Sequence, residues 1–136
     1  MARRARRPVY VSGLIERSDD HVMITCSDPS DALQRRWGFP CGLVSGGDSP
    51  EAALRALTRK SFGLDVEVMV GQPPILSTVE GEEVELRFFF CGVVEEFDVP
   101  TGAPEVRWIP KPHLLEYDFD DMSQPVVDWL CSSGKA

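Results

Sequence analysis

Acidic side chains are the residues of this sequence most able to hold a metal ion. The run Glu80–Glu85 contains four glutamates beside a single glycine. Carboxylate oxygens are the ligands that hard cations such as Mg²⁺ prefer. An acidic run of this kind is more often a solvated hairpin turn than a metal cluster. The run is therefore a candidate cation site, with a solvated turn as the alternative.

Softer metal ligands are scattered along the chain, which has four cysteines and two histidines: Cys26, Cys41, Cys91, Cys131, His21 and His113. No two cysteines form a CxxC pair, so a zinc site is not expected. Cys26 and Cys91 lie in apolar, strand-like runs and are predicted to be reduced core residues, as in a cytoplasmic protein. Cys41 is predicted to be inert unless the field around it is positive.

The residues just described must be positioned by a set of strands and two or three helices. Segments 9–15 and 21–26 predict a hairpin, and the run 84–94 predicts a strand at the centre of a sheet. Residues 27–34 and 97–104 are expected to be loops. Further strands are predicted over 66–70, 75–79 and 105–109, and helices over 111–117 and 123–131.

The strongest helix signal begins after a glycine-rich turn at 45–47. Asp48 or Ser49 can serve as N-cap, and a proline at position 50 is tolerated in the first turn. The helix is expected to continue to residue 62. Gly63 is then a C-terminal stop in the left-handed conformation.

Length and charge limit the classes of protein. The 136 residues suit one domain, which we predict over 9–131, with a basic tail at 1–8 and a short tail at 132–136. The net charge is −8 although four arginines stand in the first seven residues, and this acidic body argues against extended nucleic acid as a partner. No stretch approaches the roughly 20 apolar residues of a membrane span. We therefore expect no membrane partner and a cytoplasmic location.

The segment from Trp37 to Leu64 resembles the Nudix box of the MutT-like pyrophosphohydrolases. It contains Trp37-Gly38-Phe39-Pro40-Cys41-Gly42, then Asp48, the helix and Gly63-Leu64, and the 23 residues from Gly42 to Leu64 equal the length of the box. The flanking hairpin and the later strands also fit, so the resemblance covers nearly the whole chain. It implies an α+β fold, an α/β/α sandwich around a mixed β-sheet.

The resemblance also implies an activity. Relatives of this kind cleave a nucleotide or nucleoside diphosphate derivative at its pyrophosphate with water and Mg²⁺ or Mn²⁺, which box carboxylates hold. It assigns the phosphate region to Gly42, Gly46 and Gly47. It assigns the base region to Phe119 and Ser123, although a packing role is the simpler reading of Phe119.

The carboxylates of the box are missing here. In a gapped alignment Arg55 takes the place of the motif arginine, and Ala56, Arg59 and Lys60 take the places of glutamates. The ungapped alignment puts Ala56-Leu57 in place of the motif's Arg-Glu and Lys60-Ser61 in place of its pair of glutamates. Only the first glutamate position of the motif still holds an acidic residue, Asp48. We expect the helix face of positions 52, 56, 59 and 60, namely Ala, Ala, Arg and Lys, to stand where the cation would bind and to repel it.

Three explanations remain open. In the first, hydrolysis is weak or lost, and Arg55, Arg59 and Lys60 bind phosphates directly; Arg35 and Arg36 are further candidates, or belong to a solvated loop. The protein would then be a nucleotide sensor or a protein-interaction module. In the second, relocated ligands rebuild a catalytic metal site from Asp48, Glu51, Glu82 and Glu83. In the third, the basic residues form a solvated face. A cofactor, Mg²⁺ or Mn²⁺, is needed only if activity survives. The oligomeric state stays open, a homodimer included.

Overall fold

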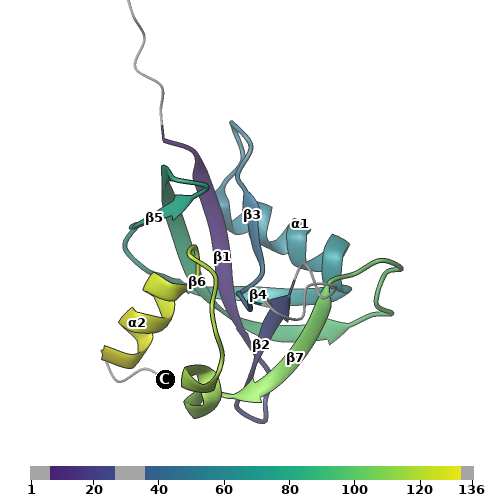
Figure 1. Cartoon of the computed structure of the whole chain (residues 1–136). Coiled ribbons are helices and arrows are strands. Elements are labelled where there is room, and N and C mark those ends of the chain that lie inside the picture. Colours follow the sequence, from purple (N-terminus) through teal and green to yellow (C-terminus); the bar gives the residue numbers. More distant parts are fainter. Residues whose placement is uncertain (1–6, 27–35, 133–136) are drawn as a thin grey trace, which may run out of the picture.

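The computed structural model describes residues 7–26 and 36–132, and these form a mixed sheet with helices on both faces (Figure 1). The strand order is β4-β6-β1-β2-β7, with β3 paired to β1 and β5 paired to β6. The strands are β1 (Val9–Glu16), β2 (His21–Cys26), β3 (Cys41–Leu43), β4 (Leu64–Gly71), β5 (Ile75–Val79), β6 (Glu82–Glu96) and β7 (Glu105–Pro110).

Strand β6 organises the sheet, as the apolar run at 84–94 predicted. It pairs in parallel with β1, from Val9↔Glu85 to Glu16↔Gly92, and antiparallel with β4 and β5 on its other side. A strand with neighbours on both edges and layers on both faces must be apolar almost throughout. The inward-facing side chains of β6, such as Phe88, are fully buried.

Helix α1 (Pro50–Phe62) begins and ends where its sequence signals place it. The Ser49 hydroxyl accepts a hydrogen bond from the Ala52 N–H at 3.1 Å, which satisfies one of the free donors of the first turn. Gly63 ends the helix with φ 68° and ψ 31°, a conformation that favours glycine. The choice left open between Asp48 and Ser49 as N-cap is thus decided for Ser49.

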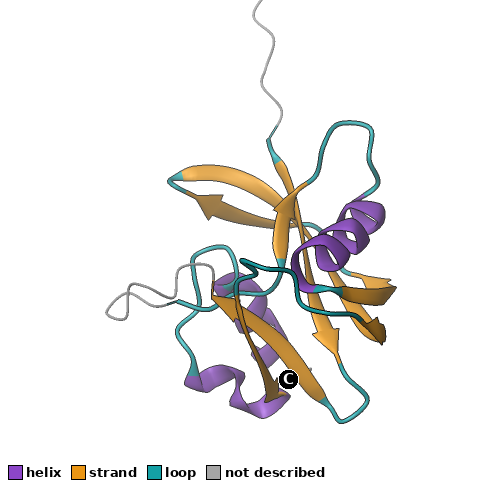
Figure 2. Ribbon diagram, turned by 90° about the vertical axis from the view of Figure 1, so that its right-hand side faces the viewer, coloured by secondary structure: helices purple, strands orange, loops and turns teal. Residues whose placement is uncertain are grey.

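Two apolar clusters lie on the two faces of the sheet. One contains Leu54 and Phe62 of α1 packed on the strands, and the other contains Val126 and Leu130 of α2 (Gln124–Ser132). Figure 2 shows the sheet between the two helices. The predicted α/β/α sandwich around a mixed sheet is confirmed.

The predicted elements differ from the structure mainly at their ends. Strand β4 starts at Leu64 rather than 66, β6 extends over 82–96, and residues 111–116 form a 3₁₀-helix, η1 (Lys111–Glu116). The apolar segment 37–44 is interrupted by the proline at position 40 and forms only the short β3 and isolated bridges. The predicted loop at 27–34 and most of both predicted tails lie outside the described residues. No helix in the described part of the chain is long and apolar enough to cross a membrane.

Candidate functional site

A pocket of 220 Å³ opens beside the C-terminal half of α1. Its walls are largely apolar, with Phe39 and Pro40 on one side, Leu57 and Phe62 of α1 on another, and Pro104 from the segment before β7. Polar groups also line it: Thr25, Arg36, Ser61 and Asp120. Apolar walls with a few polar groups are typical of small-molecule sites, although their volumes usually start at about 300 Å³.

Two segments far apart in sequence meet to form this pocket. Trp37 forms a parallel bridge with Phe119, its N–H donates to the Asp118 carbonyl at 2.8 Å, and its carbonyl accepts from the Asp120 N–H at 2.9 Å. On its other side, Gly38 bonds with Thr25 of β2 in both directions at 2.8 Å. These main-chain bonds bring Asp120 to the pocket.

Asp120 also begins the turn that leads into α2. Its Oδ1 accepts a hydrogen bond from the Ser123 N–H at 2.9 Å. A Cβ at Gly38 would lie 2.7 Å from Asp120 Oδ2 and 3.0 Å from Ser123 Oγ, so a larger residue there would require these side chains to shift. The carboxylate thus bonds to the main chain through Oδ1 and packs against Gly38 through Oδ2.

The two residues assigned to the base region lie behind the pocket wall and not among the residues that line it. Phe119 is buried and stacks on Phe39, with ring centroids 5.5 Å apart and an angle of 26°. Ser123 is also buried, and its Oγ accepts a hydrogen bond from the Phe39 N–H at 3.3 Å. Both residues contact Phe39, which lines the pocket.

Helix α1 contributes three residues to the pocket, Leu57, Ser61 and Phe62, of which Leu57 and Ser61 lie one turn apart. The helix runs unbroken from Pro50 to Phe62 and ends at Gly63. The geometry agrees with the ungapped alternative, in which Leu57 and Ser61 stand at places that the box gives to glutamates.

The expected helix face is formed by positions 52, 56, 59 and 60. None of these four residues lines the pocket. The gapped alignment shifted the register along the helix, and a shift of one residue turns the face by about 100°. The α1 residues that do line it, Leu57, Ser61 and Phe62, are neutral.

The basic residues assigned to phosphate binding are dispersed. The guanidinium of Arg59 lies over the Phe97 ring, 3.9 Å from its centroid, and Arg55 lines a separate open groove with Glu51. Lys60 is exposed and does not line the pocket. Arg36 does line it and forms an exposed ion pair with Asp121 at 3.2 Å. Arg36, which lies outside α1, is thus a predicted phosphate-binding residue that lines the pocket.

The glycines of the box have different surroundings. A Cβ at Gly42 would lie 3.3 Å from Leu57 Cδ2, so this backbone packs directly against α1. Gly46 and Gly47 lie in an exposed turn closed by a hydrogen bond from the Asp48 N–H to the Ser45 carbonyl, at 3.1 Å. Neither glycine lines the pocket.

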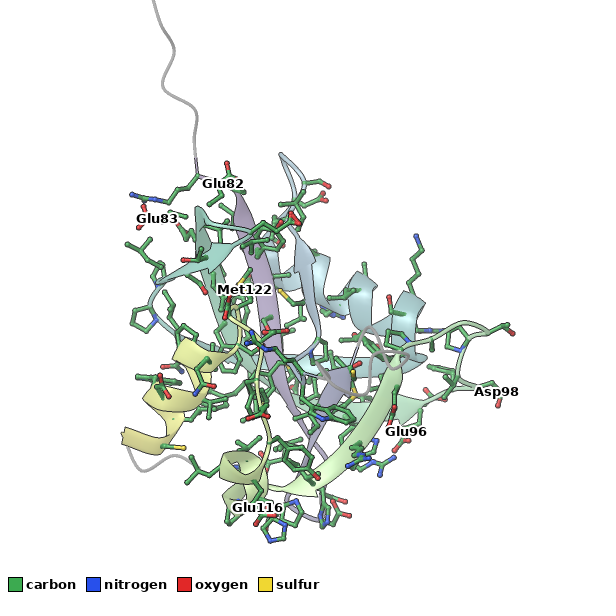
Figure 3. All side chains as sticks on the ribbon, viewed as in Figure 1. Glu82, Glu83, Glu96, Asp98, Glu116 and Met122 are labelled. Atoms are coloured by element: carbon green, nitrogen blue, oxygen red, sulfur yellow. The ribbon has the colours of Figure 1, made fainter. Side chains whose placement is uncertain are left out.

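The candidate carboxylates do not gather into a metal site. Figure 3 shows Glu82 and Glu83 at the tip of the β5–β6 hairpin, pointing away from α1, and Glu83 accepts a hydrogen bond from Arg7 at 2.9 Å. Asp48 and Glu51 are exposed at the start of α1. Within residues 7–26 and 36–132, no three His, Cys, Asp or Glu side chains lie close enough to hold a cation. The pocket beside α1 offers one carboxylate, Asp120, with the hydroxyls of Ser61 and Thr25, and this set falls short of the several carboxylate oxygens that hold Mg²⁺ or Mn²⁺.

Cys41 lines the pocket as an unreactive thiol. Burial, together with the negative charge of Asp120, raises its pKa from 9.0 to about 12. Since the thiolate is the nucleophile, Cys41 stays protonated and inert near neutral pH. The prediction of an inert side chain agrees with this environment.

Three pocket residues were missed by the sequence argument: Thr25, Asp120 and Pro104. No local pattern marks them, because the pairing of Trp37 with Phe119 and of β2 with β7 brings them together. Leu57 and Ser61 did carry a signal, since the ungapped alignment places both of them in the box.

Comparison with known proteins gives matches in structure only. No family model and no curated protein matches the sequence. A NUDIX hydrolase from Nitrosomonas europaea aligns with a TM-score of 0.74 at 19% identity, covering 96% of this chain and 91% of that one. A UDP-X diphosphatase aligns at 0.73 and 12% identity, covering 99% and 67%. A structure described for MutT from Aliivibrio salmonicida and Vibrio cholerae aligns at 0.64 and 26% identity, covering 94% and 99%.

Proposed function

We propose that this chain, whose fold is that of the Nudix superfamily, binds a nucleotide or nucleoside diphosphate derivative in the pocket beside α1 and hydrolyses it weakly or not at all. The similar structures include a UDP-X diphosphatase and a MutT protein, which favours a nucleotide derivative as the ligand. The pocket lies between the segment 36–42 and α1, the two parts of the chain that resemble the box.

One observation carries the proposal of weak or absent hydrolysis. Leu57 and Ser61 line the pocket from α1, at places where the resemblance implies carboxylates. A hydrocarbon and a single hydroxyl cannot replace the charged oxygens that a hard cation requires. The relocated alternative gains no support, because Glu82 and Glu83 point away from the helix.

The test is a panel of nucleotides and nucleoside diphosphate derivatives read by thermal shift, with Mg²⁺ and with EDTA, while phosphate release is measured in parallel. A ligand that binds the folded state raises the melting temperature by mass action. We expect stabilisation that survives EDTA, with little or no phosphate release. Rapid metal-dependent turnover would contradict the proposal, and so would the absence of any shift across the panel.

The cellular location stays a prediction, cytoplasmic, and so do the domain boundaries. A homodimer is neither favoured nor opposed by the contacts within one chain.

A further inference from the structure

A second cavity, of 300 Å³, lies on the α1 side of the sheet at the C-terminal end of that helix. The connection over residues 97–104 runs from β6 to β7, two strands that β1 and β2 separate in the sheet. Figure 1 shows this connection beside the C-terminal end of α1. The cavity is lined by Phe62 of α1, by Val99 and Pro104 of the connection, and by strand residues such as Met23 and Trp108.

The walls of the second cavity are apolar and carry no net charge. Eight of the ten residues that line it are apolar or aromatic. The other two, Arg17 and Glu96, form an ion pair with each other at 2.9 Å. A charged ligand would therefore leave water without a free counter-charge in the cavity, which is unfavourable. The lining favours an uncharged ligand.

Two aromatic walls of the cavity are restrained by arginines. The Arg17 guanidinium lies over the Trp108 ring and that of Arg59 over the Phe97 ring, each 3.9 Å from the ring centroid. The Phe97 N–H also donates a hydrogen bond to the Gly63 carbonyl at 2.7 Å. These contacts hold the rings in place before a ligand binds, as is usual for small-molecule sites.

The connection leaves apolar surface of this cavity open to solvent. Phe97 is 39% exposed and Val99 is 68% exposed, and both line the cavity. A ligand that covers them removes hydrocarbon from water, which favours binding. The volume of 300 Å³ lies at the lower end of the about 300–1,000 Å³ of small-molecule sites, so it suits a ligand of about one or two fused rings.

This cavity is distinct from the pocket beside α1. Phe62 and Pro104 line both and form the wall between them, whereas Arg36 and Asp120 line only the pocket beside α1. An inference about the second cavity therefore does not rest on the proposed function.

We infer that the second cavity is a binding site for a small, uncharged aromatic molecule. Its aromatic walls, Phe62, Phe97 and Trp108, can pack edge-on or offset against a planar ring, and aliphatic side chains fill the remaining contact surface. The ion pair of Arg17 with Glu96 closes one end without attracting an ion of either sign.

The first experiment titrates the protein with three indoles of similar size and different charge: 3-ethylindole, which is uncharged, indole-3-acetate, an anion, and tryptamine, a cation. Binding is followed in ¹H–¹⁵N NMR spectra by the indole N–H of Trp108, assigned with Trp108→Phe, and by the amides of residues 96–99. We expect 3-ethylindole to shift these signals saturably, and the charged indoles to bind at least about tenfold more weakly.

The second experiment places a charge at the rim of the cavity. The variant Val99→Asp is expected to weaken the binding of 3-ethylindole at least about tenfold. The control, Val94→Asp, makes the same change at a valine that does not line the cavity, and its dissociation constant should stay within about twofold of the wild type. Val99 and Val94 are 68% and 64% exposed, so we expect both variants to fold, and the NMR spectra check this.

Four outcomes would overturn the inference. The first is the absence of a saturable shift with 3-ethylindole, and the second is equal affinity for either charged indole. The third is equal affinity of Val99→Asp and the wild type. The fourth is a shift of the same signals with protein concentration alone, because a second copy of the chain would then cover the cavity.

Discussion

Asp120 has two roles at the scale of single residues. It accepts the hydrogen bond that starts the turn into α2, and its charge lies close enough to Cys41 to raise the pKa of that thiol. Burial is the larger cause of the raised pKa, as it is for Cys91, whose pKa is also raised to about 12. In both thiols, burial disfavours the charged thiolate.

The two buried thiols predict a loss of stability in alkali. Between pH 9 and 12 the unfolded chain releases these protons while the folded chain retains them, so ionisation favours the unfolded state. The free energy of unfolding should fall as pH rises above about 9, by at most about 1.4 kcal/mol per pH unit for each thiol. Urea denaturation at pH 8.5 to 10.5 measures this.

The matched variant for that measurement is Cys41→Ala with Cys91→Ala. Tyrosine and lysine side chains titrate in the same range, and both proteins share them. The variant should therefore show a shallower decline with pH than the wild type. Parallel declines would mean that these thiols ionise as readily in the folded state as in the unfolded state.

Helix α1 is the element on which the site depends, and its two ends fix its register. Ser49 caps the first turn, and Gly63 ends the last with φ 68°. Between these ends, Leu57, Ser61 and Phe62 line the pocket, while Arg59 and Lys60 do not. A change at either end is expected to affect stability and the pocket together.

The substitution Gly63→Ala tests the C-terminal end. It should destabilise the protein by more than about 1 kcal/mol, because the left-handed conformation is unfavourable for alanine. The added Cβ would also lie 2.6 Å from the Asp98 carbonyl oxygen. The control is Gly46→Ala, since a Cβ there meets no atom within 4 Å. Similar midpoints for the two variants in chemical denaturation would contradict this account of the cap.

At the scale of the whole molecule, Phe88 joins the layers. It is fully buried on β6 and contacts three rings edge-on, those of Phe39, Phe90 and Trp129. These rings come from the pocket segment, the sheet and α2. The side chain therefore couples the pocket wall to the core that α2 covers.

Truncation of this ring, Phe88→Ala, should cost about 3–5 kcal/mol, as is usual for a large aromatic residue in a packed core. The control is Leu115→Ala, because Leu115 is 72% exposed and should change stability by no more than about 0.5 kcal/mol. Thermal and urea unfolding report both values. A cost below about 1 kcal/mol at Phe88 would show that the pocket segment and α2 do not share this core.

The sequence by itself predicted most strands and the helix α1, and its resemblance to the Nudix box implied the sandwich. Apolar runs have the period of strands, Ser49 and Gly63 carry local conformational preferences, and both signals act over a few residues. The absence of box carboxylates is also a property of the sequence in either alignment. These features depend on neighbours along the chain, so they could be predicted without a tertiary structure.

Only the tertiary structure decided which residues form the pocket. Asp120 reaches it through the pairing of Trp37 with Phe119, and Pro104 arrives from the segment before β7. It also placed Phe119 against Phe39 behind the pocket wall, and Leu57 and Ser61 among the residues that line the pocket. Long-range pairing and the exact rotation of a helix depend on contacts between distant segments, and no local pattern records them.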